Sequence, residues 1–159
     1  MPIPYQIMPL ANIEIKRRST VAMNNSHGKA FEDRLRKTAR MLGWYVLRLP
    51  TPVSYYTLRM PGDFILFTPN TTLLIECKAT KHDKYKPASM RQYDKFKEFN
   101  IYKTQGNAAV IVDFIDSFGE HTYSHCLAAD VDTKVLTAEE SCNSLRDVLL
   151  SIEVVTVCK

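Results

Sequence analysis

Two acidic residues and a lysine flank a pair of short apolar segments in the middle of the chain. Asp63 precedes the first segment, 64–67, and Glu76 and Lys78 close the second, 72–78. The four residues between the segments, Thr-Pro-Asn-Thr, are typical of a turn, so the pattern predicts a β-hairpin. Antiparallel pairing about this turn places residues opposite each other when their numbers sum to about 139. Asp63 then lies opposite Glu76, or one residue from it.

These three residues have the side chains for metal-assisted chemistry. Side chains alternate between the faces of a strand, so Glu76 and Lys78 point to the same face. Paired carboxylates with open positions suit Mg²⁺, which takes hard oxygen ligands and leaves sites for water and phosphate. A lysine beside them can orient or deprotonate an attacking water and stabilise charge on a phosphoryl group. A surface ion pair is the alternative for an isolated Glu-x-Lys, and the additional acid at Asp63 favours the metal site.

The arrangement Asp63…Glu76-Cys77-Lys78 resembles the signature of the PD-(D/E)xK nuclease superfamily. The resemblance implies hydrolysis of phosphodiester bonds with Mg²⁺ or Mn²⁺ as the cofactor. One departure is that Gly62 separates the proline of the motif from the aspartate. The carboxylate is retained, and only the proline is shifted.

Composition restricts the class of protein without identifying it. The chain has 159 residues, 45% of them hydrophobic, and a net charge of +4, which suits one globular domain and permits a polyanionic partner. We find no apolar run of membrane-spanning length and no signal-peptide pattern. The four cysteines are scattered, as expected for reduced thiols in a cytoplasmic protein.

The N-terminal residues differ in character from the rest. Residues 1–24 contain three early prolines and a basic run at 16–18. We expect them to form a flexible basic arm, and residues 25–159 to form a single nuclease domain. Chain termini are commonly loose, but a basic arm can also settle on DNA phosphates, and the sequence leaves both open.

A helix is predicted to follow this arm. Asn25 and Ser26 suit its N-cap, apolar residues then recur at helical spacing, and Gly43 suits its end. Glu32 lies at the edge of the apolar stripe, where the helix dipole alone would favour an acid. The segment from Gly28 to Glu32 resembles the opening helix of Holliday junction resolvases of the archaeal Hjc and bacterial RecU types. The resemblance implies that Glu32 adds a third carboxylate to the metal site.

Two capping boxes predict two later helices. Ser-x-x-Gln predicts a helix from Ser89, and Thr-x-x-Glu predicts another from Thr137. Gln92 also matches a glutamine that follows the Glu-x-Lys strand in both resolvase types, which implies a place near the metal and the substrate. Residues 154–159 are β-prone, and we expect an edge strand or a dimer contact there. The expected catalytic set is Glu32, Asp63, Glu76, Lys78 and Gln92, of which the first three hold the metal.

Further strands are predicted at 44–49, 107–114 and 121–127. The second of these is almost continuously apolar, as a strand buried on both faces should be. His121 and His125 share one face of the last strand. Because no third ligand of suitable spacing is nearby, we expect them to face solvent rather than to bind metal.

Basic, polar and aromatic side chains around the expected site are candidates for DNA contact. A loop such as the one before Asp63 can contact phosphates and stack on bases, although an ordinary exposed loop explains it equally. This loop is a long insertion in RecU-type enzymes and is short here, closer to the Hjc type. The basic segment after Lys78 has a solvated loop as its alternative. The expected DNA-binding residues are Lys29, Arg48, Ser54, Tyr55, Arg59, Lys81, Lys84, Lys86 and Arg91.

These patterns together predict an α/β fold with a restriction-endonuclease-like mixed β-sheet flanked by helices. The resemblance implies a Mg²⁺-dependent, structure-selective DNA endonuclease, in particular a Holliday junction resolvase that makes symmetric nicks in four-way junctions as a homodimer. The alternatives are a related nuclease acting on linear or damaged duplex, a non-catalytic DNA-binding protein of the same fold, and a chance motif in an unrelated fold. A sheet that kept Asp63 apart from Glu76 would establish the last of these.

Overall fold

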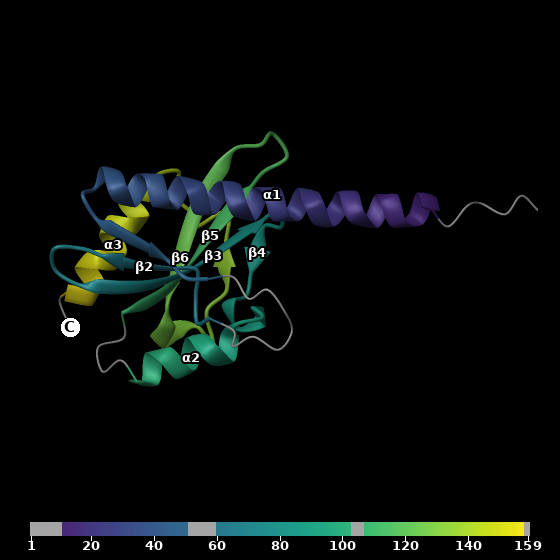
Figure 1. Cartoon of the computed structure of the whole chain (residues 1–159). Coiled ribbons are helices and arrows are strands. Elements are labelled where there is room, and N and C mark those ends of the chain that lie inside the picture. The colour runs from purple at the N-terminus through teal and green to yellow at the C-terminus, as the bar shows by residue number, and fades with distance from the viewer. Residues whose placement is uncertain (1–10, 51–59, 103–106, 158–159) are drawn as a thin grey trace, which may run out of the picture.

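A five-stranded mixed sheet forms the centre of the molecule (Figure 1). The computed structural model describes residues 11–50, 60–102 and 107–157. The strands lie in the order β1-β2-β3-β5-β6, and only β3 and β5 are parallel neighbours. Their bounds are β1 (Tyr45–Arg48), β2 (Phe64–Phe67), β3 (Thr72–Thr80), β5 (Ala108–Ile115) and β6 (His121–Leu127). The predicted mixed-sheet fold class is confirmed.

Three helices and a small second sheet complete the fold. The helices are α1 (Ala11–Met41), α2 (Tyr93–Tyr102) and α3 (Leu145–Val157). The second sheet pairs β4 (Lys84–Tyr85) with β7 (Leu136–Thr137), and short 3-10 turns span Pro87–Ser89 and Ala128–Asp130. Helix α2 is the crossover that a parallel β3–β5 pair requires. None of the described helices is long and apolar enough to cross a membrane.

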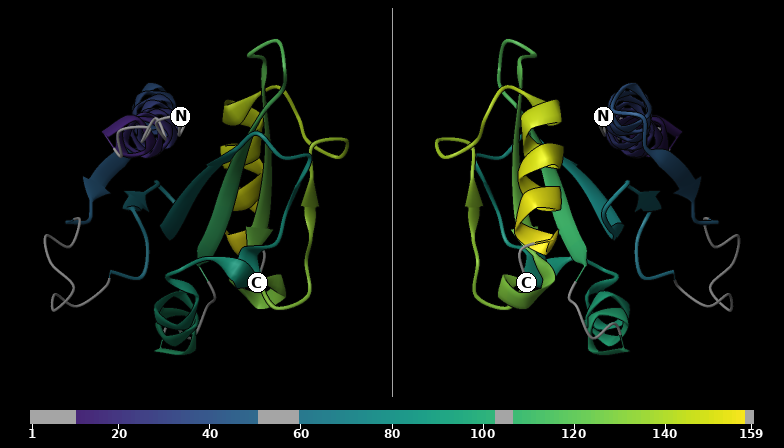
Figure 2. Two further views of the ribbon diagram at one scale, coloured as in Figure 1. Left: turned by 90° about the vertical axis from the view of Figure 1, so that its right-hand side faces the viewer. Right: turned by 90° about the vertical axis from the view of Figure 1, so that its left-hand side faces the viewer.

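The sheet separates two apolar clusters. On one face, Phe31 and Leu35 of α1 and Leu149 of α3 pack over the sheet, and on the other face Phe96 of α2 is fully buried. Figure 2 shows α1 and α3 on a different side of the strands from α2. Every residue of β5 is buried, because the strand is covered on both faces, as its apolar sequence predicted.

The hairpin prediction is confirmed in type and in register. Phe64 lies opposite Ile75, and Phe67 lies opposite Thr72. The turn is held by Thr68, whose hydroxyl accepts hydrogen bonds from the backbone N–H groups of Asn70 and Thr71. Continuing the same register by one residue places Asp63 beside Glu76.

The predicted start of the first helix is wrong. Helix α1 already begins at Ala11, and Asn25 and Ser26 lie in its interior. No proline or glycine stands between Ala11 and Ser26, so nothing in the backbone ends a helix there. The division into a flexible arm and a nuclease domain stays a prediction.

Both capping boxes mark turns instead of α-helix starts. The Ser89 hydroxyl donates to the Lys86 carbonyl at 2.7 Å, and α2 begins only at Tyr93. The Thr137 hydroxyl does accept from the N–H of Glu140 at 3.3 Å, but this bond closes a turn after β7.

The last helix also differs from the prediction. Ser144 accepts the N–H of Asp147 at 3.2 Å, next to the start of α3 at Leu145. Helix α3 then continues to Val157, so the edge strand predicted for residues 154–159 is wrong over its described part. Burial of Ile152 and Thr156 on one helical face outweighs the β-propensity of the valines.

Candidate active site

Asp63 is held by three backbone contacts at the open end of the β2–β3 hairpin. Its N–H donates to the Ile75 carbonyl at 2.9 Å, and its carbonyl accepts the N–H of Leu49 at 2.9 Å. Its carboxylate oxygen Oδ2 accepts the N–H of Cys77 at 2.7 Å. The main chain on both sides therefore fixes the position and the direction of this carboxylate.

Gly62 explains the departure from the Pro-Asp motif. A Cβ atom at this position would lie 2.9 Å from the Ile75 carbonyl oxygen and 3.1 Å from a methyl carbon of Leu74. The contact with Ile75 is to backbone, which cannot rotate away. Only glycine lets the chain approach β3 closely enough for Asp63 to reach Cys77.

The Glu76 carboxylate is buried, and neighbouring groups offset its negative charge only in part. Its side chain is 1% exposed, and among the described residues neither carboxylate oxygen has a hydrogen-bond partner. Oε1 does form an ion pair with Lys78 Nζ at 2.6 Å. Lys78 Nζ donates to Gln92 Oε1 at 3.2 Å. Gln92 thus holds the lysine beside the carboxylate, as the predicted site requires.

Glu32 reaches the same region from α1. Its Oε2 accepts a hydrogen bond from Arg48 Nη2, on β1, at 2.7 Å. The pKa of Glu32 is raised by burial and then by the negative charge of Asp63. Glu32, Asp63 and Glu76 are here called the acidic cluster; Asp63 lies beside Glu76 in the hairpin register, and the metal role predicted for the three stays a prediction.

The acidic cluster resists ionisation. Burial raises the pKa of Asp63, although the Cys77 N–H opposes the effect. Burial, together with the neighbouring Asp63, raises the pKa of Glu76 to about 7. Burial is the largest cause of all three shifts, and for Glu32 and Glu76 the negative charge of Asp63 adds to it. A cation bound among them would favour the ionised forms.

The donor set fits Mg²⁺. All the candidate ligands are carboxylate oxygens, and Glu76 offers oxygens that no described residue occupies with a hydrogen bond. Within the described ranges, no three acidic, histidine or cysteine side chains form a complete metal-holding group. Mg²⁺ does not need one, because it is usually held by one or two carboxylates and keeps several waters.

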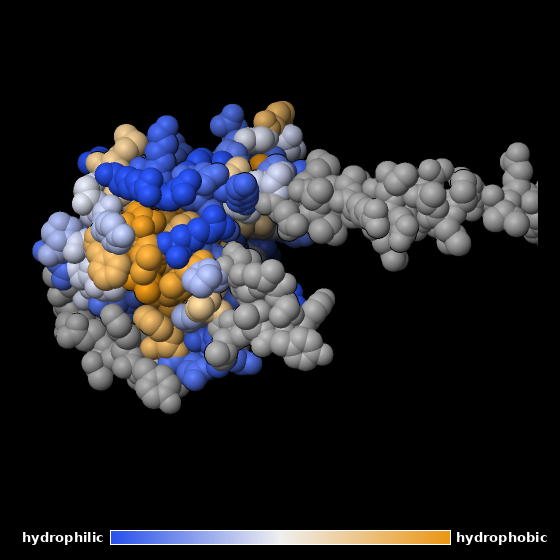
Figure 3. All heavy atoms as spheres, in the orientation of Figure 1, coloured by the Kyte–Doolittle hydropathy of each residue, from blue (hydrophilic) through white to orange (hydrophobic). Residues whose placement is uncertain are grey.

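The predicted DNA-binding residues have mixed outcomes. Arg48 forms an ion pair with Glu32, but its side chain remains 47% exposed. Ser54, Tyr55 and Arg59 lie outside the described residues, so nothing tests them. The remaining predicted residues are all exposed: Lys29, Lys81, Lys84, Lys86 and Arg91. The blue band in Figure 3 shows hydrophilic side chains gathered over α1, next to an apolar patch over β1 and β2.

Sequence reasoning missed one feature near the site and one on the opposite face of the sheet. Tyr85 on β4 has its pKa raised to about 12 by burial and then by the Glu76 carboxylate, which places it near the acidic cluster. A two-residue strand carries no periodic signal that could have shown this. His121 and His125, predicted to face solvent, are both half-buried, and His121 Nδ1 lies 2.9 Å from an oxygen of buried Asp113. An acidic residue inside an apolar strand was the available signal.

Fold and site together define a nuclease of the restriction-endonuclease-like class. A family model described as archaeal Holliday junction resolvase (Hjc) matches residues 23–143, and the chain belongs to this family. It is therefore an endodeoxyribonuclease that acts on branched DNA and resolves junctions. The matched range contains the whole predicted catalytic set.

A solved structure agrees in fold. The 1.6 Å structure of Hjc from Archaeoglobus fulgidus, a Holliday junction resolvase from an archaeal hyperthermophile, aligns with a TM-score of 0.52 and 15% sequence identity. The alignment covers 76% of this chain and 98% of that one. A comparison with curated protein sequences finds no match.

Proposed function

We propose that this resolvase nicks four-way DNA junctions symmetrically and depends on Mg²⁺, or Mn²⁺, held by Asp63 and Glu76 with Glu32 completing the set. The observation that carries the proposal is the Glu76 carboxylate. It is buried, lacks hydrogen bonds from the described residues, and has a pKa raised to about 7 beside a second carboxylate. Lys78 pairs with one of its oxygens at 2.6 Å, yet the pKa of Glu76 stays raised, so a further cation would stabilise the charged carboxylate.

Each residue has a distinct role in this proposal. A bound Mg²⁺ would supply positive charge that neutralises the phosphate during hydrolysis. Lys78 orients the attacking water and offsets the negative charge that develops on the phosphoryl oxygens. Gln92 keeps the Lys78 ammonium in place through their 3.2 Å hydrogen bond. Arg48 neutralises Glu32 until DNA and metal arrive.

The exposed basic residues bind the DNA backbone. Lys81, Lys84 and Lys86 lie on and around β4, directly after the strand that carries Glu76 and Lys78. Arg91 precedes the active-site residue Gln92, and Lys29 lies one helical turn before Glu32. A duplex arm leaving the acidic cluster in either direction therefore meets positive side chains.

We further propose that two copies of the chain work as a homodimer in the cytoplasm. Symmetric nicking cuts two strands, and each chain has one acidic cluster. Tyr45, Leu47 and Phe67 on β1 and β2 are 67%, 42% and 41% exposed, and the rings of Tyr45 and Phe67 lie 5.9 Å apart. An exposed apolar patch of this kind suits contact with a second copy.

Cleavage of a synthetic four-way junction, compared with linear duplex of matching sequence, tests the proposal. We expect paired, symmetric nicks in the junction when Mg²⁺ is present, and none in excess chelator. Asp63→Asn should abolish them, whereas Asp94→Asn, at an exposed position on α2, should not. Equal cutting of linear duplex would indicate a general nuclease. Tight junction binding without cutting in either metal would indicate a binding protein.

A further inference from the structure

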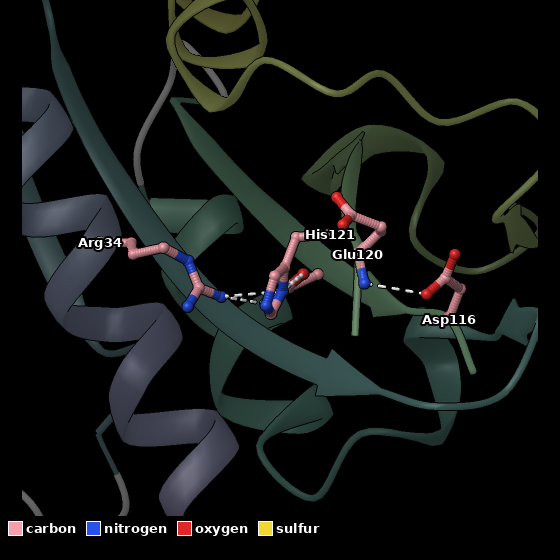
Figure 4. A network of polar contacts seen from close by, with 5 residues as sticks. Arg34, Asp116, Glu120 and His121 are labelled. Atoms are coloured by element: carbon pink, nitrogen blue, oxygen red, sulfur yellow. Dashed lines mark hydrogen bonds and ion pairs between the residues drawn. The ribbon is translucent and has the colours of Figure 1, made fainter. Parts of the chain in front are cut away.

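A second buried carboxylate lies outside the acidic cluster. Asp113 on β5 is fully buried, and it contacts Arg34 of α1 and His121 of β6. His121 Nδ1 lies 2.9 Å and 3.0 Å from its two oxygens, and Arg34 Nη2 makes a short hydrogen bond to one of them. Figure 4 shows Arg34 extending from its helix toward His121. These three residues are here called the Asp113 network.

The Asp113 network lies on the opposite face of the sheet from Glu76. Asp113 pairs with Ala79 in the β3–β5 register, and Ala79 packs in the apolar cluster under α1 and α3. Glu76 has the opposite parity on β3, which directs it to the other face. Its side-chain link toward the acidic cluster is Arg34, which lies on α1, the helix that also carries Glu32.

We propose that Asp113 is a positioning residue: through Arg34 it fixes the rotation of α1 about its axis and so holds Glu32 at the metal site. Residues two apart on a helix point about 200° apart. With Phe31 and Leu35 facing the core, Glu32 and Arg34 leave α1 on opposite sides of its buried stripe. The inference rests on the proposed metal role of Glu32.

The two charged contacts act as a pair of restraints on one helix. On one side, Glu32 binds Arg48 of β1, and on the other, Arg34 binds Asp113 of β5. Apolar contacts alone allow a helix to roll, because they are non-directional. A roll of about 20° at the outer radius of a helix moves a side chain by roughly 2 Å. Displacements of this size are large for a metal ligand.

Arg34 is well suited to transmit the restraint. Its guanidinium also lies over the Phe31 ring, 5.9 Å from the centroid, so the arginine is held by its own helix as well as by the sheet. Asp113 cannot turn toward solvent, because it is buried within the central layer. The fixed end of the contact is thus the sheet, and the part that it orients is α1.

The test measures Mn²⁺ binding by calorimetry and the Mg²⁺ dependence of junction cleavage for Asp113→Asn. We expect metal affinity to fall about tenfold, and the half-saturating Mg²⁺ concentration to rise by a similar factor, with junction binding in the absence of metal unchanged. The matched control is Asp116→Asn, an exposed aspartate at the β5–β6 turn, which should alter neither quantity. Unchanged metal affinity in folded Asp113→Asn would overturn the inference.

A double replacement separates positioning from stability. Arg34→Met with Asp113→Leu removes both charges, so no buried charge is left unpaired and the melting temperature should recover. If the inference holds, metal affinity stays low in this variant although the fold is restored. Recovery of affinity together with the melting temperature would show that the network only stabilises the protein.

The Glu32→Gln variant separates two outcomes: failure of the positioning inference for Asp113, and failure of the proposed metal role of Glu32. If Glu32→Gln leaves metal affinity unchanged, the proposed metal role of Glu32 is wrong. If Glu32→Gln weakens metal binding and Asp113→Asn does not, only the positioning inference fails. When Asp113 acts through Glu32, combining the two substitutions should weaken binding no more than Glu32→Gln alone.

Discussion

Glu76 and Asp113 are both buried carboxylates on neighbouring strands, and their surroundings are opposite. Asp113 is contacted by Arg34 and His121, so its burial is compensated within the chain. Glu76 receives only the ion pair with Lys78, and its two oxygens lack hydrogen bonds from the described residues. Since a buried charge needs compensation, Glu76 is the less fully compensated of the two carboxylates. The difference is what the proposed metal role of Glu76 requires and what a structural role of Asp113 would produce.

The weak compensation of Glu76 also determines whether the stability of the protein rises or falls with pH. The pKa of Glu76 rises from its ordinary value of 4.5 to about 7 in the folded protein. The folded state therefore binds this proton more tightly than the unfolded state. The stability linked to it is fully present below pH 4.5 and is lost as the pH rises through 7. The loss is on the order of 3 kcal/mol in the metal-free protein.

Neutralising Glu76 and neutralising Asp113 should therefore have opposite effects on the free energy of unfolding. Glu76→Gln should lower cleavage at least about 100-fold, because a metal ligand is lost. The same variant should raise the free energy of unfolding at pH 8 without metal, by up to about 3 kcal/mol. Urea unfolding in chelator measures the second effect. A less stable Glu76→Gln protein at pH 8 would contradict the comparison.

Asp113→Asn should lower stability instead. The substitution leaves the Arg34 guanidinium without its counter-charge, at a cost of about 2 kcal/mol; a fully buried pair would lose more, but Arg34 is 35% exposed. The same urea series checks this value. An unchanged free energy of unfolding would mean that water compensates the Arg34 guanidinium as well as Asp113 does.

Backbone geometry at the acidic cluster should matter more for catalysis than for folding. Gly62→Ala forces a Cβ to within 2.9 Å of the Ile75 carbonyl, so the chain before Asp63 must shift. We expect about a tenfold loss of cleavage and a loss of stability of about 1–2 kcal/mol. Gly119→Ala is the control, because its φ of 82° strains an alanine far from the cluster. The control should lose stability and keep its cleavage rate at temperatures where it is folded.

The smallest expected effect is the response of stability to metal. Mg²⁺ at ten times its dissociation constant should stabilise the protein by about 1.4 kcal/mol at pH 8. At pH 6 the gain should be smaller, because protons compete for Glu76, whose pKa is about 7. Thermal unfolding with and without Mg²⁺ at both pH values measures the difference. Equal stabilisation by Mg²⁺ at pH 6 and at pH 8 would mean that the cation does not bind at Glu76.

The sequence predicted the β2–β3 hairpin better than it predicted the helix ends. The hairpin register followed from two apolar segments and a turn, which are local features, and it alone brings Asp63 to Glu76. The start predicted at Ser89 was wrong, because a capping residue forms its side-chain hydrogen bond equally well in a turn. The start predicted at Ser26 was wrong for another reason: α1 begins at Ala11, and a serine is also tolerated inside a helix.

The Asp113 network was hidden for a different reason. An aspartate at the end of an apolar strand must have a partner, but the sequence does not say which residue it is. The partners lie 79 residues away at Arg34 and 8 residues away at His121. Pairings over such separations depend on how α1 crosses the sheet, which side-chain periodicity does not determine.

The hydrogen bond between the Leu49 N–H and the Asp63 carbonyl has a consequence for how such enzymes can diversify. It joins the two ends of the connection between β1 and β2 at its base, independently of what the connection contains. Loop length changes closure entropy only slowly, so residues there can be added, removed or exchanged at small thermodynamic cost. Asp63 keeps its place in each case. The position of Asp63 is thus insulated from changes in the connection that precedes it.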